Sequence, residues 1–142
     1  MTKTRAQQIM SDKDARTPRE VTQCIHDIAA EFEPYIIRQR RHFHKHPEPS
    51  LAEVRTTSDI ANQLDAMNIP YERPLKTGLV ATLRGTAPDA YREDGTPRRR
   101  ILLRADIDAL PVTEQTGEEF ASVNEGFMHA CGHDCHIAMM LG

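Results

Sequence analysis

Hydrophobic residues recur at helical spacing through the first third of the chain. Between positions 21 and 43 they fall mostly three or four residues apart, which is the spacing of one face of an α-helix. Pro34 lies inside this stretch, where it either kinks one long helix or begins a second one. His46-Pro47-Glu48-Pro49 ends the pattern, because a residue before proline avoids helical geometry. The apolar positions are Val21, Cys24, Ile25, Ile28, Phe32, Ile36, Ile37 and Phe43.

A second amphipathic helix is predicted after these prolines. Ser50-Leu51-Ala52-Glu53 has the form of a capping box, in which a serine and a glutamate side chain accept hydrogen bonds from backbone N–H groups at a helix start. Asn68 and Pro70 stop this helix. Its apolar stripe comprises Val54, Ile60 or Ala61, Leu64 and Met67.

Two later runs have the composition of strands. Gly78 to Leu83 favours a strand. Ile101 to Ala105 is apolar on both faces, as in a central strand covered by helices on each side. The intervening Thr86 to Arg99 contains proline and Asp-Gly and is predicted to be a loop. With a further helix beginning near Cys135, this order predicts an α/β layered domain over residues 19–142. A flexible polar leader over residues 1–18 precedes it.

The composition predicts a small aliphatic core. Hydrophobic residues make up 39% of the 142 positions, aromatic residues 5%, and tryptophan is absent. A net charge of −3 gives no electrostatic case for nucleic acid. No apolar run approaches the roughly 20 residues that cross a bilayer, and the first residues lack the apolar segment of a signal peptide. A cytoplasmic location without a membrane partner is expected, and there the three cysteines remain available to metals.

A dense group of potential metal ligands lies near the end of the chain. The stretch from Met128 to His136 holds three histidines, two cysteines and one aspartate. Gly132 separates Cys131 from His133, and glycine permits the tight backbone path that turns a thiolate and an imidazole toward one ion. We interpret Cys131 and His133 as metal ligands. The spacing alone leaves a structural zinc site, a redox thiol pair and a catalytic metal site as alternatives.

Two carboxylates, Asp106 and Asp108, follow the predicted central strand. Ligands gather at the carboxyl ends of strands in layered α/β sheets, and two side chains one residue apart point the same way from an extended segment. One carboxylate can contact a metal or its ligand while the other holds position behind it. The alternative is that both make local backbone hydrogen bonds in a turn.

The histidines at the end of the first helix are interpreted differently. We expect His42, His44 and His46 to be exposed, since imidazole near a helix C-terminus suits the helix dipole. Substitution of His44 by alanine is therefore predicted to have little effect.

Three motifs together resemble the opening part of the M20 metallopeptidase family. The branch they match contains N-acyl-amino-acid, hippurate and auxin-conjugate hydrolases. The motifs occur in the family's order and cover most of the chain from about residue 40 onward. They are Arg41-His42-Phe43-His44-Lys45-His46-Pro47-Glu48, Leu103-Arg104-Ala105-Asp106-Ile107-Asp108-Ala109-Leu110-Pro111 and Met128-His129-Ala130-Cys131-Gly132-His133-Asp134.

The resemblance implies a zinc-exopeptidase-type catalytic domain in which two divalent ions, zinc or manganese, activate water for amide hydrolysis. It also implies that Cys131 and His133 bind metal and that Asp108 orients a metal-ligand side chain. Asp106 stands where other branches carry a metal-binding histidine, and we do not expect it to be a ligand. The expected partner is a small N-acyl amino acid or short peptide. A homo-oligomer is expected only if the family's dimerisation domain is present.

The family's later motifs have no counterpart before Gly142. These are a catalytic glutamate pair, further metal-binding histidines and the dimerisation domain. The glutamates at 114, 118, 119 and 125 precede the ligand cluster, so none can be carried over as the general base. We expect residues 19–142 to be the N-terminal part of such a domain and to be inactive alone.

The alternative function is a non-catalytic module that binds metal or a protein partner. His129, Cys131, His133, Cys135 and His136 could close a structural tetrahedral site. Paired Cys-x-x-Cys sequences are missing, however, and this interpretation leaves Asp106 and Asp108 without a role. Cys135 stands where the family typically has glycine, and we expect it to pack rather than to bind metal.

Overall fold

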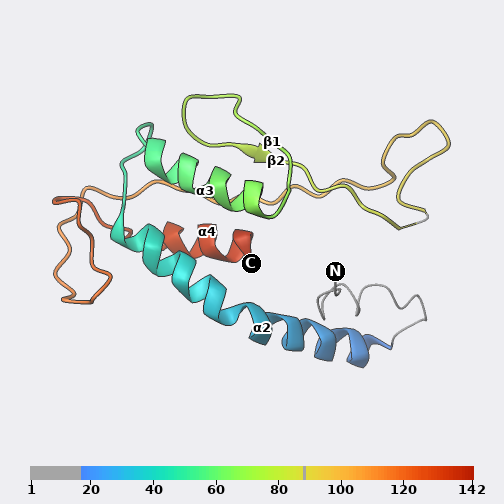
Figure 1. Cartoon of the computed structure of the whole chain (residues 1–142), viewed down its shortest axis with the longest axis horizontal. Helices are drawn as coiled ribbons and strands as arrows, with labels where there is room; N and C mark the ends of the chain where they lie inside the picture. Colours follow the sequence, from blue (N-terminus) through green and yellow to red (C-terminus); the bar gives the residue numbers. More distant parts are fainter. Residues whose placement is uncertain (1–16, 88) are drawn as a thin grey trace.

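Three helices pack around one small core in the computed structural model, which describes residues 17–87 and 89–142 (Figure 1). Helix α2 spans Pro18–Lys45, α3 spans Val54–Ala66 and α4 spans His133–Leu141. Strands β1 (Tyr71–Glu72) and β2 (Val80–Ala81) form an antiparallel pair. All three helices contribute to the core, whose buried members are Phe43, Ile60, Leu64, Ile137 and Leu141. None of the described helices is long and apolar enough to cross a bilayer.

Helix α2 is a single element with Pro34 inside it, so the first of the two sequence alternatives holds. It begins with a capping box: Thr17 and Glu20 each accept a backbone N–H from the other, which satisfies donors that a helix start leaves unpaired. Thr17 and Pro18, the last two residues of the predicted leader, thus form the start of this helix. Its remainder, residues 1–16, lies outside the described residues.

Helix α3 begins differently from the prediction. Ser50 does not cap it; the carboxylate of Glu48 accepts the backbone N–H groups of Arg55 at 3.1 Å and Thr56 at 2.7 Å. Leu51 has a φ of 67°, so the chain turns before the helix begins at Val54 and a serine four residues earlier cannot serve. The predicted end is correct, because α3 stops at Ala66 and Asn68 adopts a φ of 58°.

The predicted central strand is wrong, whereas the strand expected within residues 78–83 is confirmed by β2. Residues 101–105 carry no strand, and Leu102 is 88% exposed. An apolar run becomes a central strand only when neighbouring strands pair with both its edges, and β1 and β2 are the two strands in the described residues. The apolar side chains of Ile101, Leu102 and Leu103 therefore remain exposed.

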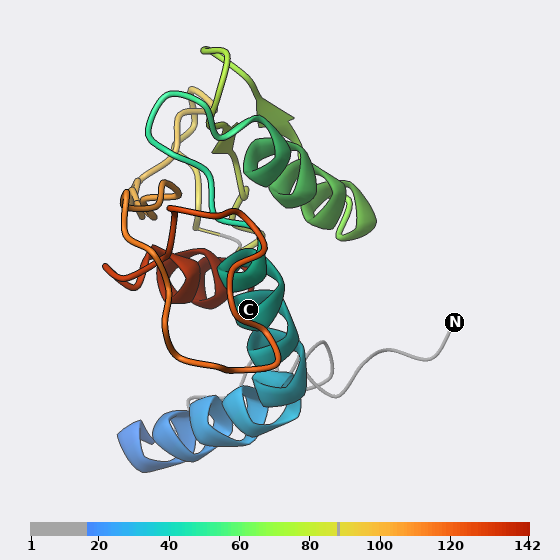
Figure 2. The ribbon, with the colours of Figure 1, turned by 90° about the vertical axis from the view of Figure 1, so that its left-hand side faces the viewer.

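The segment after residue 105 forms backbone hydrogen bonds with two other parts of the chain. Ala109 donates its backbone N–H to the carbonyl of Glu48 at 2.8 Å, and Leu110 and Met128 exchange two backbone hydrogen bonds of 3.0 Å. The loop between them lies against the C-terminal half of α2 (Figure 2), where Val123 donates to the carbonyl of Lys45. These bonds bring Asp106 and Asp108 beside the start of α4.

Candidate metal centre

His133 is the first residue of α4 and contacts Asp108. Gly132 precedes it with a φ of 85°, a left-handed conformation that glycine adopts without steric cost. The Nδ1 atom of His133 lies 3.0 Å from the Oδ1 atom of Asp108 and 3.0 Å from its carbonyl oxygen. Since both partners are acceptors, Nδ1 carries the proton, and the lone pair of this imidazole is on Nε2. A histidine held in this way is prepared to bind a metal through Nε2.

Asp106 presents one carboxylate oxygen to the same imidazole. Arg104 donates to Oδ1 from Nε at 2.8 Å and from Nη2 at 2.7 Å. The other oxygen, Oδ2, lies 4.0 Å from His133 Nε2. The hydrogen bond from Arg104 holds the pKa of Asp106 below its usual value, so this carboxylate is ionised at neutral pH.

His136 completes a group of three possible ligands. One ligand atom from each of Asp106, His133 and His136 lies within 4.8 Å of the other two. The two imidazoles, three residues apart on α4, have ring centroids 5.3 Å apart and planes inclined by 31°. Two nitrogens and one carboxylate oxygen are a donor set that divalent transition metals accept, so these residues fit the metal that the sequence predicts.

Cys131 lies at the edge of this group. Its side chain is exposed, and Sγ is 3.9 Å from the carbonyl oxygen of Asp108. Across residues 17–87 and 89–142, the single group of three or more candidate ligands contains neither cysteine 131 nor cysteine 135. His129 is also outside it, so the five side chains of the alternative module do not converge on one point. Metal binding by Cys131 and His133 stays a prediction.

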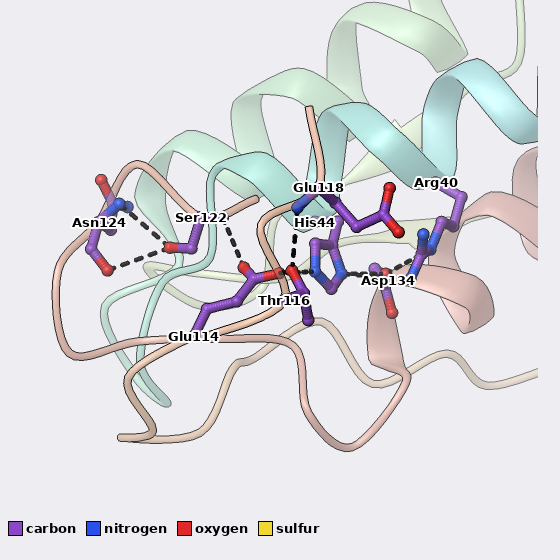
Figure 3. A network of polar contacts seen from close by, with 8 residues as sticks. All are labelled: Arg40, His44, Glu114, Thr116, Glu118, Ser122, Asn124 and Asp134. Atoms are coloured by element: carbon purple, nitrogen blue, oxygen red, sulfur yellow. Dashed lines mark hydrogen bonds and ion pairs between the residues drawn. The ribbon is translucent and has the colours of Figure 1, made fainter. Parts of the chain in front are cut away.

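His44 is buried, contrary to the expectation that it is an exposed helix-end residue, and it lies between Glu114 and Asp134 (Figure 3). It is 3% exposed. Its Nδ1 atom lies 2.8 Å from Asp134 Oδ2, and its Nε2 atom lies 3.1 Å from Glu114 Oε1. Arg40 adds an ion pair of 2.8 Å to the same oxygen of Asp134. The expectation failed because both carboxylates are at least 70 residues away in sequence.

Glu114 is held by several donors besides His44. Its Oε2 atom accepts the backbone N–H of Ser122 at 2.6 Å, and its Oε1 atom accepts the hydroxyl of Thr116. Burial acts to raise the pKa of Glu114, but these hydrogen bonds and the one from His44 outweigh it and lower the pKa. We call Arg40, His44, Glu114 and Asp134 the buried cluster.

The other two histidines near the end of α2 are half-buried. His42 Nε2 lies 2.8 Å from Asp59 Oδ2 and so connects α2 to α3. His46 donates from Nδ1 to the carbonyl of His42 at 2.8 Å. Both have definite partners, and the expectation of simple exposure fails for them too.

His129 is 3% exposed and neither ring nitrogen has a hydrogen-bond partner among the described residues. Burial lowers its pKa, and the nearby charge of Asp134 only partly opposes this. His129 is therefore neutral in the folded chain at neutral pH.

Sequence reasoning did not assign roles to Arg40, Glu114 or Asp134, and it placed His136 only in the alternative module. The available signal for His136 was its position three residues after His133, because residues at this spacing share a helix face. The residues of the buried cluster come from distant parts of the sequence, so no short-range spacing indicates their contacts.

Comparison with known proteins gives one consistent result. The model of peptidase family M20/M25/M40 matches residues 102–142. An uncharacterized hydrolase of Staphylococcus epidermidis is 43% identical over 107 residues, which are 75% of this chain and 25% of that protein. The N-acetylcysteine deacetylase of Bacillus subtilis is 45% identical over 116 residues, covering 78% and 27% respectively. The chain thus spans about a quarter of the length of these relatives.

Two solved structures share the fold. One is a dinuclear metal binding peptidase of the M20 family from Bacillus subtilis, with a TM-score of 0.68 and 42% identity over 79% of this chain and 30% of that one. The other is a putative aminohydrolase from methicillin-resistant Staphylococcus aureus, with a TM-score of 0.71 and 38% identity over 84% and 30%. These likenesses confirm the predicted α/β fold class.

Proposed function

Because the chain belongs to peptidase family M20, we propose that it forms part of a metal-dependent amidohydrolase. The substrates are N-acyl amino acids or short peptides. The chemistry named for two relatives supports this proposal, since one removes an acetyl group from N-acetylcysteine and another is a dinuclear metal peptidase.

The observation that carries the proposal is the contact between Asp108 and His133. The carboxylate of Asp108 holds the Nδ1 proton of His133, fixing the tautomer whose Nε2 lone pair can bind metal. Cys131, whose thiol lies against the carbonyl of Asp108, supplies a thiolate from the residue before Gly132. Asp108 is thus a positioning residue that acts through His133.

A bound divalent ion, zinc or manganese, would polarise the scissile carbonyl and lower the pKa of a water molecule. The chain's own residues orient the ligands for it. Glu114 is not available as the base for that water, because His44, Thr116 and Ser122 already occupy its carboxylate.

A chimeric enzyme tests this function. The matching segment of the Bacillus subtilis N-acetylcysteine deacetylase, to which the chain is 45% identical, is replaced by this chain. Hydrolysis of a panel of N-acyl amino acids is then measured with zinc and with manganese. We expect the chimera to be active, Cys131→Ala and His133→Ala to abolish hydrolysis, and the exposed His26→Ala to leave it unchanged.

Two outcomes oppose the proposal. A folded, metal-loaded chimera that hydrolyses no N-acyl amino acid or peptide would exclude the activity. Full activity in Cys131→Ala would remove the thiolate from the ligand set.

A further inference from the structure

We propose that the C-terminal half of α2 forms, together with the loop residues Glu119 and Phe120, a binding site for the phosphate group of a small molecule. Arg38, Arg41 and Lys45 supply the positive charge of this site. It shares no residue with the metal centre or with the buried cluster. The inference therefore goes beyond the proposed function and does not depend on it.

The site is an open pocket of about 320 Å³ between helix and loop. Glu119 and Phe120 form one side of it, in the loop that lies against the C-terminal half of α2 (Figure 2). The residues of the helix side lie three or four positions from one another, a spacing that places them on one face. They are Arg38, Arg41, His42, Lys45 and His46.

The three cations of the pocket have no acidic partner among residues 17–87 and 89–142. No ion pair in these ranges includes Arg38, Arg41 or Lys45, although Arg40 on the same helix has a carboxylate oxygen at 2.8 Å. Glu119 lines the pocket without pairing with them, so the side chains leave about two positive charges. The negative end of the helix dipole offsets only about half a charge. A phosphomonoester, which carries nearly two negative charges at neutral pH, matches the remainder.

Phe120 orients one of these cations. The Cζ atom of Arg41 lies 5.1 Å from the centre of the Phe120 ring, within the range of a cation–π interaction. Stacking of this kind uses the face of the guanidinium group and leaves the N–H groups in its plane free. Those N–H groups have the fork geometry that binds two phosphate oxygens at once.

Calorimetric titration of the 142-residue chain with inorganic phosphate tests the site. The chain is first freed of metal with a chelator and dialysed, so that phosphate cannot bind through an ion. We expect saturable binding, and we expect Arg41→Ala and Arg38→Ala each to weaken it by about 10-fold, the usual cost of a charge-assisted hydrogen bond. Arg38 has no cation–π contact with Phe120 among the described residues, so its substitution tests the charge without altering that contact.

Two further variants separate this pocket from general attraction of anions to the helix. Arg19 is exposed on α2 outside the pocket, and Arg19→Ala removes the same charge as Arg41→Ala. This control should bind phosphate as the unaltered chain does. Glu119→Gln removes the negative charge of the pocket and should strengthen binding by up to about 5-fold. Circular dichroism verifies the fold of each variant.

Three outcomes would overturn the proposal. They are no phosphate binding by the unaltered chain, equal losses in Arg19→Ala and Arg41→Ala, and unchanged binding in both Arg38→Ala and Arg41→Ala. None of them bears on the hydrolase, which the chimera tests.

A lipid headgroup offers the same phosphate chemistry as a small molecule. Glycerol phosphate should bind as inorganic phosphate does, whereas vesicles containing phosphatidic acid should retain no more of the chain than vesicles of phosphatidylcholine alone. Retention by the phosphatidic acid vesicles that glycerol phosphate fails to displace would overturn the assignment to a small molecule.

Discussion

Two histidine–carboxylate clusters meet at the first turn of α4. The buried cluster sets His44 between Asp134 and Glu114, with side chains that are 4%, 1% and 4% exposed. The cluster around the next-door residue sets His133 between Asp106 and Asp108, with side chains that are 21%, 39% and 29% exposed. Each cluster sets one imidazole between two carboxylates, and the consecutive residues His133 and Asp134 belong to different clusters.

The two clusters differ in how many nitrogens of the central imidazole already have a hydrogen-bond partner. Both ring nitrogens of His44 face carboxylates, and these pairs are shielded from water. The cluster therefore joins α2, α4 and the loop that contains Glu114. His133 uses only Nδ1, and its Nε2 faces an oxygen 4.0 Å away. A buried network whose imidazole has both nitrogens occupied helps to fix a fold, whereas an exposed imidazole with a free lone pair can take a ligand. Composition alone does not separate the two.

The largest expected effect is the loss of stability on removing His44. The substitution His44→Ala leaves the buried carboxylate of Glu114 without its imidazole and removes one of two partners from Asp134. Breaking a buried charged pair costs about 3 kcal/mol of unfolding free energy. Urea unfolding of this variant, with His26→Ala as the control, measures the loss. An unchanged midpoint would mean that His44 contributes no more to stability than an exposed histidine, which is what the sequence analysis predicted.

Removing Asp108 should act on metal affinity and not on stability. The substitution Asp108→Ala removes one of the two acceptors of the His133 Nδ1 proton and leaves only the backbone carbonyl of residue 108, so the imidazole is held less firmly. We expect zinc affinity to fall about 10-fold to 100-fold, measured by calorimetric titration. The urea midpoint should stay within the spread of the control variant, and a large drop in that midpoint would place Asp108 among the structural residues instead.

Lowering the pH should weaken the fold through His129. Its pKa is lowered in the folded chain, so the unfolded chain binds this proton more readily. The stability is complete above the unfolded pKa of about 6.5 and is lost as the pH falls below it toward the folded pKa, with a slope of at most about 1.4 kcal/mol per pH unit. Urea unfolding between pH 7.5 and pH 5 (about 0.1 M salt) should show this slope. The slope should shrink in His129→Leu, and an equal slope in that variant would assign it elsewhere.

The smallest expected effect belongs to His42, two residues before His44 on the same helix. Its pair with Asp59 is partly exposed, with side chains 40% and 27% accessible, and Asp59 keeps Arg55 as a neighbour. The substitution His42→Ala should cost about 0.5 kcal/mol, the usual range for exposed pairs. A loss equal to that of His44→Ala in the same urea assay would show that burial does not set the difference.

Local patterns predicted the helices well and the buried cluster not at all. Helical spacing placed α2, α3 and α4, and the rules for proline ended α2 after Lys45. Such signals depend on residues three or four positions apart. The partners of His44 are 70 and 90 residues away, and a histidine has no local feature that reports such contacts.

The failures at Ser50 and at residues 101–105 have other physical causes. Ser50 matched a capping motif, but the helix begins only at Val54, and the longer side chain of Glu48 reaches the backbone donors of Arg55 and Thr56 in its first turn. The apolar run at 101–105 has the composition of a central strand, yet that state requires paired edges that the described residues do not supply. For the candidate site, the structure brings together Asp108 and His133, which the family resemblance singles out, and their roles at a metal stay predictions. The approach of Asp106 to His136 required the tertiary structure.

The consecutive positions of His133 and Asp134 also link ligand binding to folding. A metal that binds His133 only in the folded chain would stabilise that state by about 2.7 kcal/mol at a free concentration of 100 times its Kd. Such coupling is reciprocal. A substitution in the buried cluster that destabilises the first turn of α4 must therefore lower the affinity for metal by the same factor. The melting temperature of this chain and its affinity for metal are therefore two measurements of one equilibrium.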